Sequence, residues 1–381
     1  FKDETKILRI VSGLLILIFF TLYVSSGIIA GGKSFESFFG LDFKFGAIFT
    51  LAIVVFYTFF GGFRAVCITD AFQGMLMFLV LVAVPVVAFC NLNLPDGATF
   101  WSEVAKYGKN HLNVFYDQTF LSILGLMAWG LGYFGQPHII VRFMAIRSSK
   151  ELAQARRIGI GWMAIGLAGA MMSGLIGFVY YSELNLPLAD PEKVFLQLGE
   201  TLFHPFFVGI IISAVLSAIM STISSQLLVS ASSVTQDFVF AFYKKEISQK
   251  AQVAAGRYAV VAVALVATAL AFSFNESVLN VVGYAWAGFG ASFGPVLLFS
   301  LYWRKMSALA ALLGMITGGA TVIAWIALGL NSYVYEIFPG FAVSCVVIYL
   351  TSLYGDAIDK MSNEPNSATV QDEFEKMKTR L

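Results

Sequence analysis

Residues 206–229 read FFVGIIISAVLSAIMSTISSQLLV, an apolar run long enough to cross a bilayer as one helix. The run carries four hydroxyl groups near its centre, those of Ser221, Thr222, Ser224 and Ser225. Ala218, Ser221, Thr222 and Ser225 are spaced i, i+3, i+4 and i+7, so they lie on one helical face. The stretch therefore predicts a membrane-spanning helix with an oxygen-bearing face.

Two interpretations of this face follow from the spacing alone. Hydroxyl and carbonyl oxygens suit a hard cation such as sodium, so the face is a candidate cation site. Ser and Thr in membrane helices also donate to their own i−4 carbonyls and let neighbouring helices pack closely. Both interpretations remain open at this point.

The composition extends the membrane assignment to the whole chain. Hydrophobic residues make up 58% of the chain and charged residues 12%, whereas a soluble globular protein has roughly 25% charged residues. We therefore expect an all-α, polytopic membrane protein. Ten spans are predicted, at 7–30, 44–61, 66–90, 119–141, 158–181, 203–236, 255–274, 278–302, 307–329 and 335–354.

Charges in the connectors predict one orientation. Basic residues gather after the fourth, sixth and eighth spans, as in Arg147, Lys244, Lys245 and Arg304, and such loops are cytoplasmic. The intervening connectors carry acids such as Glu276 and Glu336, and are expected outside. The net charge of +1 gives no reason to expect a nucleic-acid partner, and the three cysteines fit neither a disulfide framework nor a zinc site.

The domain organisation is expected to be simple. Residues 1–355 form one integral membrane domain, and residues 356–381 are a polar cytoplasmic tail that cannot bury much apolar surface. The 91–118 connector is expected to form a partly helical external cap. The chain begins at Phe1 without the apolar core of a signal peptide, which we interpret as the interior of a longer chain.

The fourth predicted span contains a second candidate site. Trp129, Tyr133 and Pro137 are spaced i, i+4 and i+8, and glycines lie between them at 130, 132 and 135. Glycine weakens a helix, and a proline leaves the carbonyl one turn upstream, that of Tyr133, without its donor. Broken helices at membrane depth mark binding sites in transporters. The alternative is a glycine-rich packing face with a proline kink.

Asp70 is the acid best placed to act within the membrane, about one turn into the third span. Intramembrane carboxylates usually face a partner or an aqueous cavity. The equal alternative is that Asp70 lies close enough to the cytoplasmic end to reach water or to favour the positive end of its own helix. Tyr23 with Ser25 and Ser26 forms a weaker polar patch. The YAWAGFG sequence at 284–290 favours core packing over ligand contact.

Nothing in the sequence indicates an enzyme. No Ser/His/Asp set is visible, the three histidines (His111, His138 and His204) are scattered, and the chain has no glycine-rich phosphate loop. Transport driven by ATP is therefore not expected within this chain, and no cofactor is expected.

Several long strings resemble the sodium/solute symporter family, in particular its bacterial proline-transporting members. They are GLGYFGQPHIIVRFMA at 130–145, MSTISSQLLVSAS at 220–232, YAWAGFGASFGPVLLFS at 284–300, FTLYVSSGIIAG at 20–31 and FFGGFRAVCITDAFQ at 59–73. The resemblance covers essentially the whole chain. It implies a LeuT-type fold of inverted repeats and sodium-coupled import of L-proline by alternating access, in a multi-pass protein of a bacterial cytoplasmic membrane.

The resemblance also implies roles for individual residues. Sodium, the coupling ion, would be bound at a principal site by the Ala218 carbonyl and the hydroxyls of Ser221 and Thr222. The proline site would be lined by Trp129, Tyr133, Pro137 and Tyr23. The family's remaining ligands lie on an opening core helix that this sequence lacks, so the ten spans would be what remains of thirteen.

Asp70, Ser224 and Ser225 resemble an additional sodium site of sialic-acid members, so two sodium ions remain an alternative to one. A symporter for another small carboxylated solute is the alternative within the same class. A transporter-like sensor is the alternative from another class and would require a kinase region after the last span. A channel is disfavoured, because a broken-helix site implies occlusion of the solute.

Overall fold

A computed structural model describes residues 5–108, 110, 112–113, 115–186, 188, 190–242, 247–273, 277–362 and 375. Within these ranges the regular secondary structure is entirely helical, as expected for backbone that must satisfy its hydrogen bonds inside a bilayer. Lys244, Lys245, Glu276, His111 and most of the 356–381 tail lie outside the described residues, so the expectations that rest on them are not addressed by the structure.

Among the described residues, eight helices are long and apolar enough to cross a membrane. The chain is therefore a multi-pass membrane protein. These helices are α1 (Ile7–Phe39), α2 (Phe43–Cys90), α6 (Leu152–Glu183), α8 (Pro205–Ser232), α9 (Gln249–Ser273), α10 (Val278–Tyr302), α11 (Ala308–Ala327) and α12 (Ile337–Ser362). Helix α12 thus continues past residue 355. The π-helix η4 (Ser233–Phe240) prolongs α8, in agreement with the long sixth predicted span.

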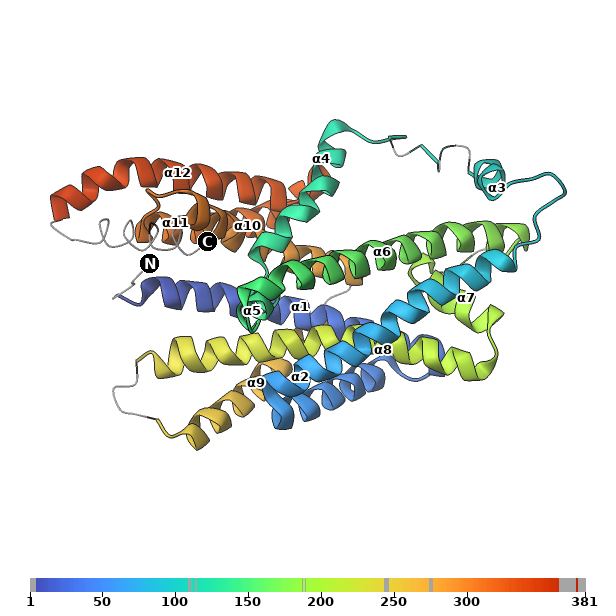
Figure 1. Cartoon of the computed structure of the whole chain (residues 1–381), viewed down its shortest axis with the longest axis horizontal. Helices are drawn as coiled ribbons and strands as arrows, with labels where there is room; N and C mark the ends of the chain where they lie inside the picture. The colour runs from blue at the N-terminus through green and yellow to red at the C-terminus, as the bar shows by residue number, and fades with distance from the viewer. Residues whose placement is uncertain are drawn as a thin grey trace.

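Helix α2 accounts for two of the ten predicted spans. Gly62 interrupts it with φ 57° and ψ −159°, a conformation accessible essentially only to glycine. In Figure 1 the chain reverses at this point, and the two halves of α2 run in opposite directions. The Gly61-Gly62 pair of the sequence therefore forms the turn between the spans predicted at 44–61 and 66–90.

The fourth predicted span is broken into three pieces. Helix α4 (Phe120–Ala128) leads into the 3-10 helix η1 (Trp129–Gly135), and α5 (Pro137–Met144) follows. Gln136 has an extended backbone (φ −84°, ψ 107°) and separates η1 from α5, with Pro137 at the first position of α5. This break confirms the discontinuity that the glycines and the proline predict.

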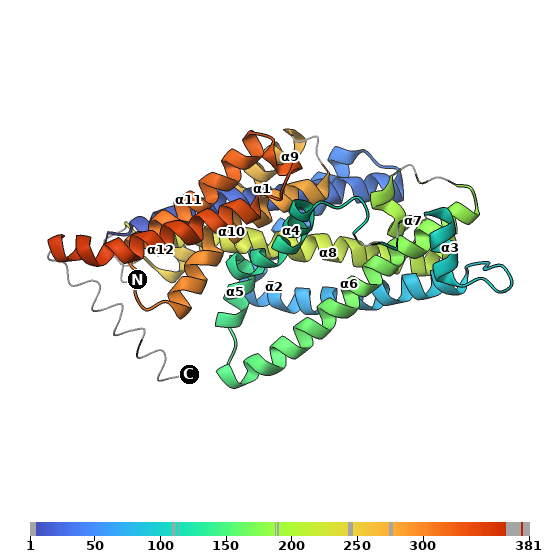
Figure 2. The same ribbon diagram turned by 90° about the horizontal axis from the view of Figure 1, so that it is seen from above.

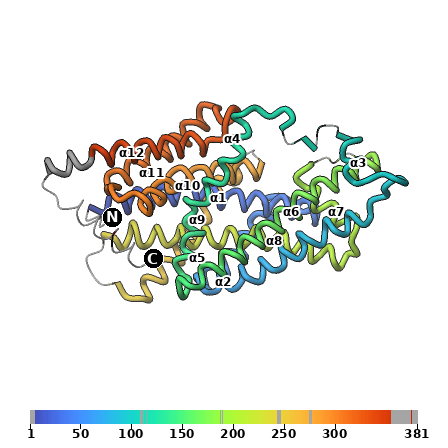
Figure 3. Tube along the Cα trace, turned by 45° about the horizontal axis from the view of Figure 1, so that its top comes forward, coloured from blue at the N-terminus to red at the C-terminus, as the bar shows by residue number. Residues whose placement is uncertain are grey.

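The broken segment crosses the bundle obliquely. Figures 1 and 3 show α4 and α5 passing between the group formed by α10, α11 and α12 and the group formed by α2, α6 and α8. Helix α10 is the most deeply enclosed of the long helices and packs directly against η1. The break therefore lies in the interior of the protein.

Short helices cover the end of the bundle opposite the start of α1. Figure 2 shows α3 (Phe100–Tyr107) and α7 (Val194–Leu202) together at that end. Thr99 and Ser102 cap α3 reciprocally, since each side chain accepts a hydrogen bond from the backbone N–H of the other. The partly helical cap expected within the 91–118 connector is therefore present as α3.

Candidate solute and sodium sites

An aromatic cluster joins the broken helix to α10 and to the connector before α12. The Trp129 ring stacks between Trp286 and Tyr335, with centroids 5.6 Å from each and interplanar angles of 14° and 16°. Tyr133 meets Trp286 edge-on at 4.9 Å. Trp129 and Tyr133 therefore share one aromatic neighbour, and the Tyr133 side chain keeps 43% of its surface exposed beside it.

Glycines allow η1 and α10 to approach this closely. A Cβ on Gly132 would lie 1.9 Å from Trp286 Nε1, and one on Gly135 would lie 2.3 Å from the Phe289 carbonyl oxygen. The Trp286 indole N–H donates to the Trp129 carbonyl oxygen at 2.9 Å. The aromatic cluster is thus held by a hydrogen bond across a contact that only glycine permits.

Tyr23 and His138 extend the same region toward α1. His138, in the first turn of α5, packs edge-on against Phe20 at 5.5 Å and Tyr23 at 6.2 Å. Tyr23 also packs against the buried cluster that contains Trp286. The structure therefore brings Tyr23, Trp129 and Tyr133 together around α10, with Pro137 beginning the helix that carries His138.

Gln136 adds a polar group at the break. Its side chain is fully buried, and Nε2 donates to the Trp286 carbonyl oxygen at 3.4 Å. Its Oε1 has no hydrogen-bond partner among the described residues. A buried amide with unused acceptor capacity is costly unless something completes it.

The oxygen-bearing face of α8 has the predicted spacing. The hydroxyls of Ser221 and Thr222 donate to the Ala218 carbonyl at 3.2 and 3.0 Å. Ser224 and Ser225 donate to the Ser221 carbonyl at 3.0 and 2.9 Å. This is the local bonding that Ser and Thr adopt in membrane helices, and it directs hydroxyl hydrogens to the backbone, leaving oxygen lone pairs free.

Asp70 lies against this helix and pairs with a base. The Ser225 hydroxyl is 3.3 Å from Asp70 Oδ2. Arg142, on α5, places Nη2 2.5 Å from the same carboxylate oxygen and 2.7 Å from Ser225 Oγ. The Asp70 side chain is 12% exposed and that of Arg142 is 39% exposed. Asp70 therefore faces partners on two other helices.

Tyr57 borders the same cluster from the first half of α2. Its hydroxyl donates to the Met220 carbonyl oxygen at 3.0 Å, and Ser224 and Gln73 flank it. The oxygens Asp70 Oδ1 and Gln73 Oε1 are buried and have no hydrogen-bond partner among the described residues.

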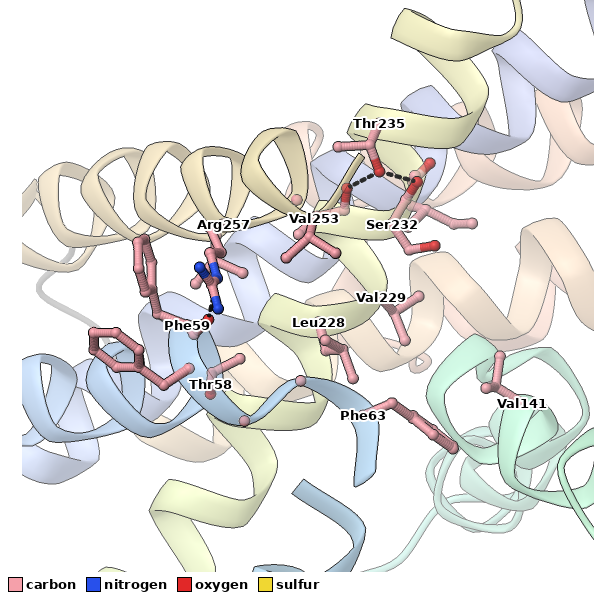
Figure 4. A pocket seen from close by; sticks show the side chains of 18 of the residues that line it. Thr58, Phe59, Phe63, Val141, Leu228, Val229, Ser232, Thr235, Val253 and Arg257 are labelled. Carbon is pink, nitrogen blue, oxygen red and sulfur yellow. Dashed lines mark hydrogen bonds between the residues drawn. The ribbon is translucent and has the colours of Figure 1, made fainter. Parts of the chain in front are cut away.

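A cavity of about 650 Å³ lies beside the Gly62 turn, between α2, α8 and α9. Figure 4 shows Phe63, Val141 and Leu228 on its walls, with Arg257 at one side. Arg257 Nε donates to the Phe59 carbonyl oxygen at 2.9 Å, and the guanidinium lies 5.2 Å from the Phe59 ring centroid. The cavity is therefore mainly apolar with a fixed base at its edge.

The sequence analysis named the candidate site residues but missed several residues that contact them. Trp286 belongs to the 284–290 stretch, whose pattern favours core packing, and the sequence pattern singled out neither Arg142 nor His138 as a site residue. A local signal for Arg142 is its position five residues after Pro137 in an otherwise apolar string, which indicates a base within the span and not in the connector. The pairing with Asp70 spans 72 positions and has no local signal.

Comparison with known proteins gives the family. The profile of the sodium:solute symporter family matches residues 1–318. The high-affinity proline transporter PutP of Bacillus subtilis (strain 168) is 50% identical over 357 residues, covering 94% of this chain and 75% of that protein. A sodium/proline symporter of Staphylococcus aureus is 48% identical over 361 residues, covering 92% and 70%. The chain belongs to the sodium:solute symporter family and is a transporter, not an enzyme.

A solved structure shares the fold. It is a sodium-coupled sialic acid symporter in a substrate-bound, outward-open state, described as revealing a novel sodium site. It aligns with a TM-score of 0.73 at 18% identity, covering 91% of this chain and 74% of that one. This likeness confirms the expected LeuT-type fold.

Proposed function

We propose that this protein imports L-proline by coupling its movement to sodium through alternating access. The observation that carries the proposal is the near-50% identity, over more than nine-tenths of the chain, with two proteins named for proline transport. The enclosed break in the fourth span supports it, because discontinuous helices in transporters form solute sites.

The solute site is assigned to the aromatic cluster. Trp129, Tyr133 and Tyr23 offer ring faces and edges to an apolar pyrrolidine ring. Pro137 has no N–H, so it leaves a backbone carbonyl at the break without its helical donor. Tyr133 is suited to direct contact, because its ring is anchored edge-on against Trp286 yet remains partly exposed.

The sodium site is assigned to Ala218, Ser221 and Thr222. Their oxygens lie on one half-buried face of α8, and hard oxygen ligands suit sodium, the cotransported ion. Sodium bound there would favour the conformation that holds proline. Proline must then raise sodium affinity by the same factor, because coupling free energies are reciprocal.

The protein is assigned to the bacterial cytoplasmic membrane, with the bilayer around residues 1–355 and the 356–381 tail in the cytoplasm. Support comes from basic residues at the start of α1 (Arg9), beside the Gly62 turn (Arg64), between α5 and α6 (Arg147) and between α10 and α11 (Arg304), because basic connectors are cytoplasmic. The cavity beside Gly62 adjoins the turn that carries Arg64 and suits a release route into the cytoplasm.

Alanine substitutions at Ser221 and Thr222 test the proposal. Each removes one oxygen ligand, so the sodium concentration for half-maximal proline uptake by proteoliposomes should rise on the order of tenfold, equivalent to about 1.4 kcal/mol. Thr222→Ser keeps the oxygen and should be much milder. Ser213→Ala is the matched control, because this exposed hydroxyl on α8 also donates to its own i−4 carbonyl. An unchanged sodium dependence in both alanine variants would refute the assignment.

A further inference from the structure

The connector that precedes α12, residues 333–336, is anchored to both neighbouring helices of its group. The Trp325 indole N–H on α11 donates to the Val334 carbonyl oxygen at 3.1 Å. The Tyr335 hydroxyl donates to the Gly283 carbonyl oxygen on α10 at 2.8 Å. The connector is therefore held by one hydrogen bond from its backbone and one from its side chain.

Tyr335 reaches the broken span from this connector. Helix α4 packs closely on its backbone, because a Cβ on Gly125 would lie 3.0 Å from the Tyr335 nitrogen. The Tyr335 ring then stacks on Trp129 with centroids 5.6 Å apart and planes 16° from parallel. Trp286 covers the opposite face of the same indole. Both faces of Trp129 are thus occupied by aromatic rings, and a solute can meet only its edge.

The position of the Trp129 edge depends on these two neighbours. Trp129 begins the 3-10 helix η1, whose hydrogen-bond geometry is poorer than that of an α-helix. Its backbone is held on one side by the hydrogen bond from Trp286. On the other side, the Tyr335 ring limits how far the indole can tilt away from Trp286, because stacked rings resist both tilt and separation.

We propose that Tyr335 is a positioning residue that fixes the Trp129 ring and thereby sets the size of ring that the solute site accepts. The inference rests on the proposed transport of proline. Tyr335 acts through Trp129 and does not itself contact the solute. The connector between α11 and α12, which contains none of the predicted site residues, therefore contributes to specificity.

Ring size is the property that such a contact controls. Pipecolic acid, the six-membered-ring homologue of proline, has one additional methylene group. An apolar pocket distinguishes solutes that differ by one methylene by roughly 10–200-fold. That discrimination requires the contacting groups to stay in place. Without Tyr335 the edge of Trp129 can move away from the solute, and the larger ring then fits.

Competition between the two solutes tests the inference. Uptake of radiolabelled proline by proteoliposomes is inhibited with unlabelled proline or pipecolic acid, and the selectivity is the ratio of the half-inhibiting concentration of pipecolic acid to that of proline. Tyr335→Leu removes the ring and should lower this ratio roughly tenfold. It should also raise the half-saturating proline concentration, while the maximal rate and the sodium dependence at saturating proline stay close to wild type.

Two variants serve as controls for the loss of the ring. Tyr335→Phe keeps the stack and removes only the hydroxyl, so it should retain most of the selectivity. Tyr333→Leu makes the same substitution two residues earlier, on a side chain that is 69% exposed, and should leave both the selectivity and the half-saturating proline concentration unchanged.

Thermal unfolding in detergent tests the contact without any solute. Tyr335→Leu and Trp129→Leu each remove the same stack, and substitutions of residues in contact are not additive. Tyr335→Leu should therefore lower the melting temperature less in the Trp129→Leu background than in the wild-type protein. Equal decreases in the two backgrounds would show that Tyr335 does not act through Trp129 and would overturn the inference.

An unchanged selectivity ratio in a folded Tyr335→Leu variant would also overturn it. If that variant does not fold, Trp325→Phe decides, because it removes only the indole N–H that anchors Val334 and keeps an aromatic ring. Trp325→Phe should lower the ratio, and an unchanged ratio would overturn the inference. Absence of proline uptake by the wild-type protein would instead refute the proposed function, and the melting temperatures would still test the contact between Tyr335 and Trp129.

Discussion

The glycine at position 132 should determine whether the solute site forms. In Gly132→Ala the new Cβ would lie 1.9 Å from Trp286 Nε1, whereas ordinary contact begins at 3.4 Å. The indole must therefore retreat by about 1.5 Å, the difference between these distances. That movement breaks the hydrogen bond to the Trp129 carbonyl oxygen and disturbs the stack with Trp129.

The magnitude follows from these two contacts. The hydrogen bond contributes about 1 kcal/mol, and an aromatic pair contributes about 0.5–1.5 kcal/mol beyond its buried area. A combined loss of about 2 kcal/mol at the solute site corresponds to a roughly 30-fold rise in the proline concentration for half-maximal uptake. Overpacking should also lower the free energy of unfolding by about 1–3 kcal/mol.

Gly130→Ala is the matched control. It makes the same chemical change two residues away in η1, where a Cβ would meet nothing within 4 Å. Radiolabelled proline uptake by proteoliposomes and thermal unfolding in detergent should be measured for both variants. Equal effects of the two substitutions, or normal proline affinity in Gly132→Ala, would refute the role assigned to the Trp286 contact.

Two further substitutions probe the site and the fold. Tyr133→Ala should raise the half-saturating proline concentration on the order of tenfold, because it removes the partly exposed ring beside Trp286; uptake kinetics measure this, and an equal effect of Phe134→Ala on its exposed neighbour would argue for general packing. Gly62→Ala should lower stability by about 1–3 kcal/mol, because its backbone conformation (φ 57°, ψ −159°) excludes other residues. Thermal unfolding tests this against Gly74→Ala, where a Cβ would meet nothing within 4 Å, and a normal melting temperature for Gly62→Ala would contradict it.

The sequence predicted those parts of the fold that depend on local chemistry. Hydropathy located the long helices, Gly61 and Gly62 marked the turn within α2, and the glycines before Pro137 predicted the break at Gln136. Each of these signals acts within a few residues of the structure that it specifies. Helical periodicity likewise placed Ala218, Ser221 and Thr222 on one face.

The remaining features depend on contacts between distant segments. Trp286 lies 157 positions from the Trp129 carbonyl that it binds, so alternating small and aromatic residues could only suggest packing. Arg142 had the same local appearance as the cytoplasmic bases that follow it. The contacts of Arg142 with Asp70 and Ser225 form only when α2, α5 and α8 are brought together.

Uptake driven by an imposed sodium gradient tests the central claim most directly. Proteoliposomes containing the purified protein should accumulate radiolabelled proline above the external concentration when sodium is higher outside. Accumulation should disappear when potassium replaces sodium or when a sodium ionophore collapses the gradient. Unlabelled proline should compete better than other small carboxylated solutes. Equal proline accumulation without a sodium gradient, or none with it, would contradict the account.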